Sequence, residues 1–303
     1  MSGLPLSKTD WESKFRDWAA PPGATETKRC DNAVGAVRNA IKASAKLQSK
    51  SVSVILQGSY NNNTNTKGES DVDIGVVCSD TFFYDIPDGT TAQTFSISPA
   101  TYSFDQFKAD LGEALTGYFG SGAVKRGNKA FDVKETSYHV EADVAPFFTH
   151  RRYNNKGGVI EGVEMRPDDN PAKKIINWPD QHYENGVAKN KDTGTRFKSL
   201  VRVLKSLRNE MCENKVSAAE PVIGFLNECM VWNTPNHLFG SDRYYDDVNA
   251  VLTHLYNATK TDDLCREWGE VSELKYLFRA SQKWTRQQAN DFVLAAWRYV
   301  GFK

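Results

Sequence analysis

The sequence predicts an α+β protein in which a half that contains strands is followed by a helical half. Two short runs rich in β-branched residues, Val52–Leu56 and Asp71–Val77, have the length and composition of buried strands. From Trp178 to the end, apolar residues recur at helical spacing, and the predicted helices cover residues 195–213, 219–232, 241–259 and 285–300. A chain of 303 residues is long enough for two such units, each with its own core.

The overall composition argues against several classes of protein. The 38 basic and 38 acidic residues cancel, so no positive excess favours sequence-independent binding to DNA or RNA. The five cysteines include no C-x-x-C pair and form no cluster with the five histidines, which predicts reduced thiols and no structural zinc. No apolar run approaches the roughly 18 residues of a membrane span, and the N-terminus lacks an apolar signal core. We therefore expect a soluble, cytoplasmic, monomeric protein without a membrane anchor.

The first 47 residues are predicted to be helical and to pack across both halves. Ser7 or Thr9 is suited to cap the first helix, on which Trp11 and Phe15 share an apolar face. The run Pro21-Pro22-Gly23 interrupts the helical pattern, and a second helix is expected to follow it.

Residues 48–150 are predicted to form the unit that contains the sheet. After the strand that ends at Val77, residues 79–101 are predicted to be a loop, and Phe104–Phe119 carries apolar residues at helical spacing. Further strands are expected within Ala130–Glu135 and Tyr138–Pro146.

Residues 151–176 are predicted to be a connector because they are rich in Asn, Gly and Pro. A hairpin is expected around Val159–Met165. Residues 177–303 then form the predicted helical lobe.

The stretch Gln57–Asp73 carries the first candidate site. Side chains alternate along a strand, so Asp71 and Asp73 point to one side and Val72 to the other. Two carboxylates so close together cannot pair with each other, and a hard cation is their natural partner. Before them, Gly58 allows a ligand to approach the backbone, and Ser59 offers a hydroxyl and an N–H to phosphate oxygens.

A third carboxylate is predicted on a neighbouring strand. In Tyr138–Pro146, Val140, Ala142 and Val144 share one face. Glu141 and Asp143 share the other face. A site for two metal ions needs such a third carboxylate. Asp143 is the preferred candidate and Glu141 its rival.

A basic stripe lies on the first long helix of the helical lobe. Lys198, Arg202 and Lys205 recur at spacings of four and three, on the side of the helix opposite its apolar residues. Such stripes are commonly solvated surfaces. In a protein that binds a triphosphate, this stripe is a candidate phosphate clamp.

These segments together resemble a known group of enzymes. An apolar strand, Gly-Ser, a polar loop and D-x-D at the start of a second strand are similar to the palm of polymerase-β-like nucleotidyltransferases. The wider pattern resembles the bacterial cGAS/DncV-like nucleotidyltransferases, called CD-NTases. The matching segments are LQGSYNNNTNTKGESDVDIGVV (residues 56–77), EADV (141–144), IINWPDQHYENGVAKNKDTGTRFKSLVRVLKSLRN (175–209) and FLNECMVWNTP (225–235).

The resemblance implies a mixed-sheet palm and a helical lobe with the active site in the cleft between them. It also implies two Mg²⁺ ions, replaceable by Mn²⁺, on Asp71, Asp73 and Asp143. The residues expected to bind nucleotide are Gln57, Gly58, Ser59, Asn177, Lys198, Arg202 and Lys205, with Lys198 reaching the triphosphate. One departure is Gly224, at a place where the family often has a serine that touches the triphosphate.

The activity implied is the joining of two or three nucleoside triphosphates into a cyclic second messenger of bacterial anti-phage signalling, with release of pyrophosphate. A linear 2′-5′ oligonucleotide synthetase, and a transferase acting on an antibiotic or an RNA end, stay open within the superfamily. A catalytically inactive nucleotide-sensing module is the alternative from another class, and the three carboxylates argue against it. The expected partners are the nucleoside triphosphates and an effector that binds the product, without a nucleic-acid activator.

Asn177, in the run IINWP, is the candidate for base selection. In the branch that this run most resembles, an asparagine here accompanies the use of pyrimidines. A carboxamide offers an acceptor and donors that match O4 and N3–H of uracil. The prediction is a uridine-containing cyclic dinucleotide, with a dipurine product as the alternative. Asn177 could instead cap the turn at Trp178-Pro179.

Overall fold

The computed structural model describes residues 6–68 and 71–302, which form two compact units. The sheet unit comprises Gly23–Tyr60 and Ser70–Pro179, and the helical unit comprises Met1–Pro22, Asn61–Glu69 and Asp180–Lys303. Each unit has its own hydrophobic core. The domain boundaries predicted at residues 47, 150 and 176 stay a prediction. The segment that follows the Gly-Ser turn, from Asn61 on, is part of the helical unit.

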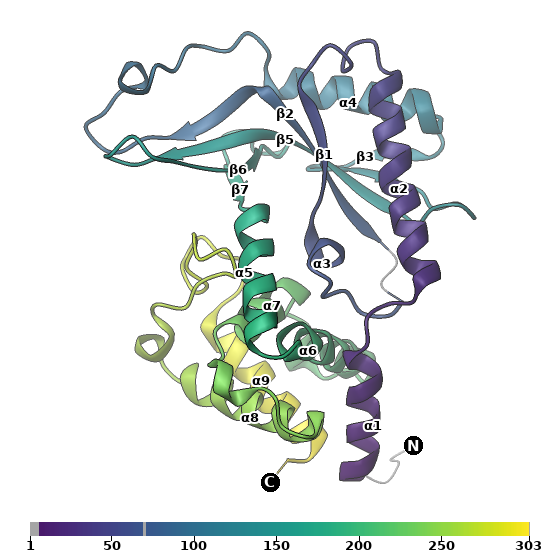
Figure 1. The fold of residues 1–303 in the computed structure, drawn as a ribbon, viewed down its shortest axis with the longest axis vertical. Coiled ribbons are helices and arrows are strands. Elements are labelled where there is room, and N and C mark those ends of the chain that lie inside the picture. The colour runs from purple at the N-terminus through teal and green to yellow at the C-terminus, as the bar shows by residue number, and fades with distance from the viewer. Residues whose placement is uncertain (1–5, 69–70, 303) are drawn as a thin grey trace. The chain divides into compact units, whose positions relative to one another are not determined.

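The elements of the described residues are ordered as in an α+β protein, with the named strands all before residue 178 and helices after it (Figure 1). The α-helices are α1 (Lys8–Ala19), α2 (Ala24–Ala43), α3 (Gly58–Asn61), α4 (Phe104–Phe119), α5 (Pro179–Asp192), α6 (Arg196–Glu213), α7 (Gly224–Trp232), α8 (Tyr244–Ala258) and α9 (Arg286–Val300). The strands are β1 (Val52–Leu56), β2 (Val72–Asp85), β3 (Val124–Arg126), β4 (Phe131–Val133), β5 (Ala142–Tyr153), β6 (Val159–Met165) and β7 (Ile175–Asn177). Short 3₁₀ helices are η1 (Ala92–Phe95), η2 (Ser217–Ala219), η3 (Asn236–Leu238) and η4 (Asp262–Cys265).

The strands of the described residues form one mixed sheet. Strands β1, β2, β5, β4 and β3 lie side by side in that order, and β6 and β7 continue from β5. Only β2 and β5 pair in parallel among these strands; the other pairs are antiparallel. Parallel strands need a crossover, and α4 lies in the connection between them. Helices α2 and α4 pack against each other and against the sheet (Figure 1).

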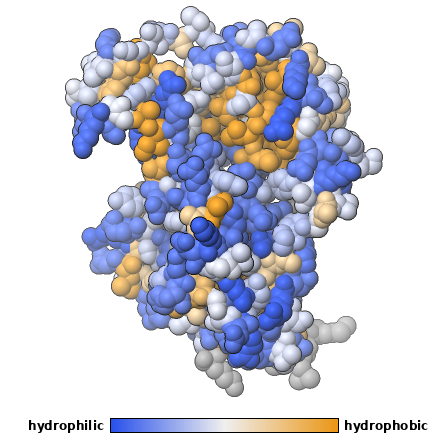
Figure 2. All heavy atoms as spheres, viewed as in Figure 1, coloured by the Kyte–Doolittle hydropathy of each residue, from blue (hydrophilic) through white to orange (hydrophobic). Residues whose placement is uncertain are grey.

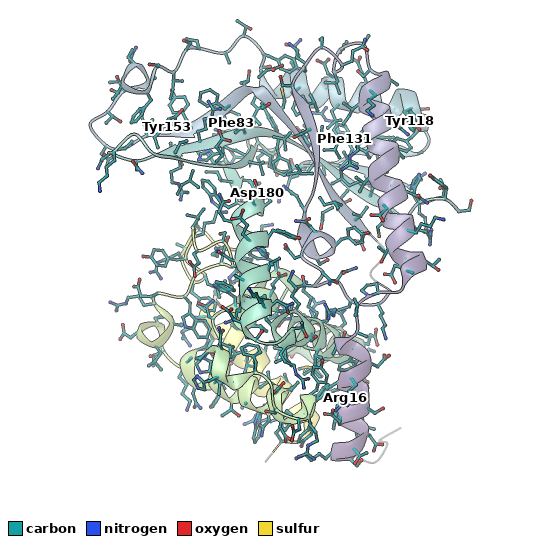
Figure 3. The ribbon with its side chains drawn as sticks, in the orientation of Figure 1. Arg16, Phe83, Tyr118, Phe131, Tyr153 and Asp180 are labelled. Atoms are coloured by element: carbon teal, nitrogen blue, oxygen red, sulfur yellow. The ribbon has the colours of Figure 1, made fainter. Side chains whose placement is uncertain are left out.

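The loop predicted over residues 79–101 is wrong for its first part, because β2 continues to Asp85. The register shifts between Cys78 and Phe82, and the strand then pairs again with β5. Such a bulge bends a strand without ending it. Phe83 packs there against Phe148 with ring centroids 5.4 Å apart, as the sticks of Figure 3 help to locate. The sequence after the bulge favours a strand, since it contains Phe82 and Phe83. The polar pair Ser79-Asp80 interrupts the apolar pattern, so the strand pattern ends there in the sequence.

The alternation predicted for the two central strands is confirmed. Val72, Ile74 and Val76 are at most 1% exposed, whereas Asp73 between them is exposed. In β5, Asp143 is likewise exposed between the buried Ala142 and a buried valine. The buried face packs into the core of the sheet unit, so the aspartates are left on the opposite face.

The helical unit is organised around α6, whose apolar residues are fully buried. Ser7 is the residue that caps α1, and its hydroxyl exchanges hydrogen bonds with Asp10. Trp11 and Phe15 of α1 enter the core of the helical unit with their rings stacked 5.3 Å apart.

The surface of the two units differs in hydropathy. In Figure 2, apolar residues gather on the visible face of the sheet unit, whereas that of the helical unit is mainly polar. Among the residues described, none of the helices combines the length and hydrophobicity needed to cross a membrane.

Candidate active site

Three aspartates lie at paired positions on three neighbouring strands of the sheet unit. Asp73 of β2 pairs in register with Asp143 of β5, and Asp143 pairs with Asp132 of β4. Paired residues place their side chains on the same face, so the three carboxylates form a row across the sheet. Asp71 comes directly before β2 and is exposed. The geometry therefore brings together the carboxylates that the sequence separated by about seventy residues.

The pKa of Asp143 is affected by the neighbouring carboxylates. Burial raises its pKa, and the charges of Asp73, Asp132, Asp71 and Glu141 raise it further, to about 6. Like charges in a row disfavour one another's ionisation, and a bound cation would reverse this effect. Glu141, the rival candidate, lies just before β5 and contributes the smallest of these effects. The register with Asp73 favours Asp143 as the third carboxylate.

Asp132 is a site residue that the sequence analysis missed. It lies in the three-residue strand β4, half-buried between the buried Phe131 and Val133. The motif apolar-Asp-apolar is the same alternation that marked Asp73. The signal was present, but a three-residue strand is too short to stand out from the sequence alone.

Gly58 touches the first carboxylate. Its φ of +65° is a conformation that favours glycine, and a Cβ there would overlap the Asp73 carboxylate and lie 3.0 Å from its Cγ. Gln57 extends the ladder, since its N–H donates to the Asp73 carbonyl at 3.0 Å. Its side-chain Nε2 is buried and has no hydrogen-bond partner among the described residues. An unpartnered donor beside the carboxylates fits a site that receives an anionic ligand.

Ser59 follows in the short helix α3 and is half-buried. The next residue anchors this turn, because the Tyr60 hydroxyl lies 3.0 Å from both the Thr27 carbonyl and Asp31 Oδ1. Both partners belong to α2. The position of Ser59 is therefore fixed within the sheet unit from two sides, by β1 before it and by α2 through Tyr60.

The donor set fits hard divalent cations. Carboxylate oxygens are the ligands that Mg²⁺ and Mn²⁺ prefer, and burial together with the neighbouring negative charges raises the pKa of Asp143. Within residues 6–68 and 71–302, no group of three acidic, histidine or cysteine side chains is already gathered as a complete metal site. The fit rests on the chemistry of Asp71, Asp73 and Asp143 and on the register of Asp73 with Asp143. Metal ligation by these residues stays a prediction.

Lys198, in the helical unit, is the cation of the predicted stripe that forms no hydrogen bond through its ammonium group with a described residue. Its side chain is 8% exposed, and its Nζ lies 5.5 Å from the centre of the Tyr183 ring. Burial lowers the pKa of Lys198, while the nearby Glu228 opposes this shift. A desolvated ammonium without an acceptor is suited to receive a phosphate.

Arg202 and Lys205 are already engaged within the helical unit. The Arg202 guanidinium donates to the Ala19 carbonyl at 2.5 and 2.8 Å and to the Asn63 carbonyl at 2.5 Å. Lys205 Nζ donates to the Thr64 carbonyl at 3.0 Å. Direct nucleotide binding by these two residues stays a prediction. Helical periodicity identified the stripe, but it could not show that neighbouring carbonyls occupy two of its three cations.

Gly224, the departure from the family pattern, is the first residue of α7. A Cβ at this position would lie 3.2 Å from Lys205 Cε. A serine here would press on the end of the lysine that holds Thr64. The glycine and the lysine are thus matched to each other in this chain.

Asn177 is the last residue of β7 and is half-buried. It pairs with Val163 of β6. Its side-chain amide forms no hydrogen bond with a described residue, so no capping bond to the following turn accompanies it. Its role in base selection stays a prediction.

Carboxylates on adjacent central strands beside a Gly-Ser turn suit a nucleotidyltransferase, whose catalysis depends mainly on positioning and on neutralising phosphate charge. Residues 37–149 match the family model of the nucleotidyltransferase domain. Residues 184–301 match that of the cGAS/DncV-like nucleotidyltransferase C-terminal helical domain. The chain belongs to the cGAS/DncV-like nucleotidyltransferases, and the predicted family, fold class and enzyme class are confirmed.

Relatives match along nearly the whole chain. The cyclic dipyrimidine nucleotide synthase CdnE of Legionella pneumophila is 42% identical over 96% of this chain and 98% of its own. The enzyme of the same name from Cecembia lonarensis is 38% identical over 96% and 98%. The structure of the Elizabethkingia meningoseptica CdnE cyclic dinucleotide synthase with GTP and Apcpp is similar at a TM-score of 0.80, with 33% identity over 96% of this chain and 99% of that one.

Proposed function

We propose that this protein joins two nucleoside triphosphates into a cyclic dinucleotide that contains at least one pyrimidine. The observation that carries the proposal is the row of paired carboxylates at Asp73 and Asp143, with Gly58 against the first of them. The full-length similarity to two enzymes named cyclic dipyrimidine nucleotide synthases supports the product class. The family resemblance further implies a second messenger of anti-phage defence, read by a downstream effector.

The reaction is two successive nucleotidyl transfers. A ribose hydroxyl oxygen of one nucleotide forms a bond to the α-phosphorus of the other, the hydroxyl proton is lost, and pyrophosphate leaves. The second transfer closes the ring in the same way, so each cyclic dinucleotide is accompanied by two pyrophosphates. Because the attacking group comes from the substrate, the protein needs no nucleophile of its own and acts by positioning and charge.

The roles of the chain's residues follow from their places. Asp71, Asp73 and Asp143 supply carboxylate oxygens to divalent ions, of which the resemblance implies two. When bound, such ions neutralise phosphate charge and acidify the attacking hydroxyl. Gly58 leaves room for the ligand beside Asp73, Gln57 offers an unpartnered side-chain donor, Ser59 offers a hydroxyl, and Lys198 pairs with the triphosphate.

Replacing Lys198 with methionine is expected to lower activity without lowering stability. A charge-assisted phosphate contact accounts for about 1.5–3 kcal/mol, so Lys198→Met should lower kcat/KM about 10- to 100-fold, mainly through KM. The melting temperature without nucleotide should stay equal or rise, since a desolvated ammonium is removed at nearly constant volume. Steady-state pyrophosphate release and thermal unfolding measure the two effects. Lys191→Ala, which alters an exposed lysine of α5, is the control, and an unchanged KM in Lys198→Met would contradict the role.

The enzyme is expected to work without DNA or RNA. The formal net charge is zero, so no overall positive field favours a nucleic-acid polyanion. Nuclease-treated protein should turn over nucleoside triphosphates at the same rate, within about twofold, with or without added duplex. Loss of activity on nuclease treatment, restored by duplex DNA or RNA, would be the opposite result.

Mass spectrometry of the product made from all four nucleoside triphosphates with Mg²⁺ tests the proposal. A cyclic dinucleotide with a uracil or cytosine base is the expected product. A cyclic dipurine is the main alternative, favoured by the GTP bound in the Elizabethkingia meningoseptica structure. A cyclic trinucleotide or a linear 2′-5′ oligomer would change the product class. No pyrophosphate release would indicate a nucleotide-sensing module.

A further inference from the structure

The segment from Asn61 to Gly68 is a polar stretch of the helical unit in which half of the residues are buried. Asn62, Thr64, Asn65 and Thr66 are all at most 8% exposed, and Thr64 is fully buried. Polar loops normally run over the surface, so a buried polar segment needs specific partners. Two candidate functional elements flank it in sequence, the Gly-Ser turn before it and Asp71 after it.

Glu228 of α7 holds this segment by its side chain. Its carboxylate accepts a hydrogen bond from the Thr64 hydroxyl at 2.9 Å and lies 2.9 Å from His182 Nε2 of α5. Lys205 Nζ of α6 lies 3.6 Å from the same carboxylate and also donates to the Thr64 carbonyl. Glu228, His182, Lys205 and Thr64 therefore form one buried cluster, which we call the Glu228 cluster.

The charge state of the cluster follows from its contacts. Lys205, His182 and Thr64 together lower the pKa of Glu228 to about 2, against the effect of burial. The carboxylate is thus ionised at neutral pH and can only accept hydrogen bonds. His182 must then donate to it through Nε2.

A cluster of buried charged groups is not the most stabilising way to fill a protein core. Buried ions carry a large desolvation cost, and apolar residues of similar volume are often equally stabilising. A buried ion set with defined partners instead selects one arrangement of the groups that it joins. Here those groups are α5, α6, α7 and the backbone at Thr64.

We propose that Glu228 is a positioning residue for nucleotide binding, which acts by holding Thr64 and thereby fixes residues 61–68, the segment that follows the Gly-Ser turn. The substrate contacts belong to the residues on either side of the segment. Glu228 itself is buried within the helical unit, at 3% exposure. The proposal deepens the proposed function and rests on it for the identity of the substrate, a nucleoside triphosphate.

Thr64→Val removes the hydroxyl that donates to Glu228 at nearly unchanged volume, and Thr64→Ser keeps it. Thr64→Val is expected to weaken binding of a non-hydrolysable UTP or ATP analogue with Mg²⁺ about tenfold, as measured by calorimetry, and to raise KM more than it lowers kcat. Hydrogen exchange of residues 61–68 should increase, while that of α6 and α7 stays unchanged. Thr64→Ser should restore both the affinity and the protection.

Thr259→Val is the matched control. Thr259 is fully buried in the same unit, and its hydroxyl donates to the Leu255 carbonyl at 2.7 Å and accepts from Asn290. This variant should lose stability without a change in nucleotide affinity, as a purely structural threonine would. The positioning role is overturned if Thr64→Val binds the analogue like the wild type, or if its affinity falls only as much as that of Thr259→Val. If the wild type binds the analogue but makes no cyclic product, the proposed function fails, and the comparison of the three variants still decides the positioning role.

Discussion

Replacing Asp71 and Asp73 together with asparagine is expected to abolish nucleotidyl transfer without unfolding the protein. Both lie on the exposed face at the start of β2, and Asp73 is in register with Asp143. If these carboxylates hold the divalent ions, their loss should reduce pyrophosphate release at least about a thousandfold, which corresponds to about 4 kcal/mol of transition-state stabilisation. Release from radiolabelled nucleoside triphosphates at saturating Mg²⁺ measures it. Asp88→Asn, in an exposed turn, is the control.

The same variant is expected to be at least as stable as the wild type when no metal is present. The pKa of Asp143 is raised to about 6, so its ionisation destabilises the folded state as the pH rises from about 4 to 6. Among the neighbouring charges, that of Asp73 raises the pKa of Asp143 most. Removing it should recover up to about 1 kcal/mol of folding stability at pH 7.5; the gain is small because solvent screens these exposed groups. The gain should vanish near pH 4, where Asp143 is protonated in both proteins.

Thermal unfolding at pH 7.5 and pH 4 in the presence of a chelator tests this second expectation. Full turnover by the double variant would remove Asp71 and Asp73 from the proposed site. A large loss of stability at pH 7.5 would mean that the two side chains support the fold instead. Neither result is expected for carboxylates that face solvent beside like charges.

The strand positions of the site could be predicted because burial leaves a strong period-two pattern. Val72, Ile74 and Val76 are apolar and fill the core, while Asp73 alternates with them on the opposite face. Asp143 was predicted in the same way. What the pattern could not provide is register, which depends on partners distant in sequence. Only the paired strands show that Asp73, Asp143 and Asp132 stand in one row.

The basic stripe shows what helical periodicity cannot predict. Helical spacing identified Lys198, Arg202 and Lys205 as one face, and all three are in fact buried. The partners of Arg202 and Lys205 are Ala19, Asn63 and Thr64, which lie far away in the sequence, whereas the ammonium group of Lys198 has no hydrogen-bond partner among the described residues. Periodicity describes one helix, whereas hydrogen-bond partners depend on what packs against it. The functional difference within the stripe was therefore beyond prediction from sequence.

Asn177 is expected to control which base is used. Its backbone is fixed by strand pairing with Val163 of β6, and the neighbouring Gly162 approaches it so closely that a Cβ there would lie 2.6 Å from the Asn177 carbonyl oxygen. Its side-chain amide has no partner among the described residues and can offer an acceptor and donors to a uracil edge. A site built to pair with such an edge rejects a base that leaves its groups unpaired. We therefore expect Asn177→Ser to lose pyrimidine use selectively.

In competition between equimolar UTP and ATP, each labelled in turn, Asn177→Ser should reduce UTP incorporation relative to ATP about 10- to 100-fold, because two hydrogen bonds to the base are lost or weakened. Total turnover of ATP should change much less. Asn257→Ser, which alters an exposed asparagine of α8, should leave the ratio as in the wild type. If the wild type makes product from ATP and GTP alone and never incorporates UTP or CTP, the pyrimidine prediction is wrong. In that case Asn177 has no base-selecting role, and its rigid position serves only the junction between β7 and α5.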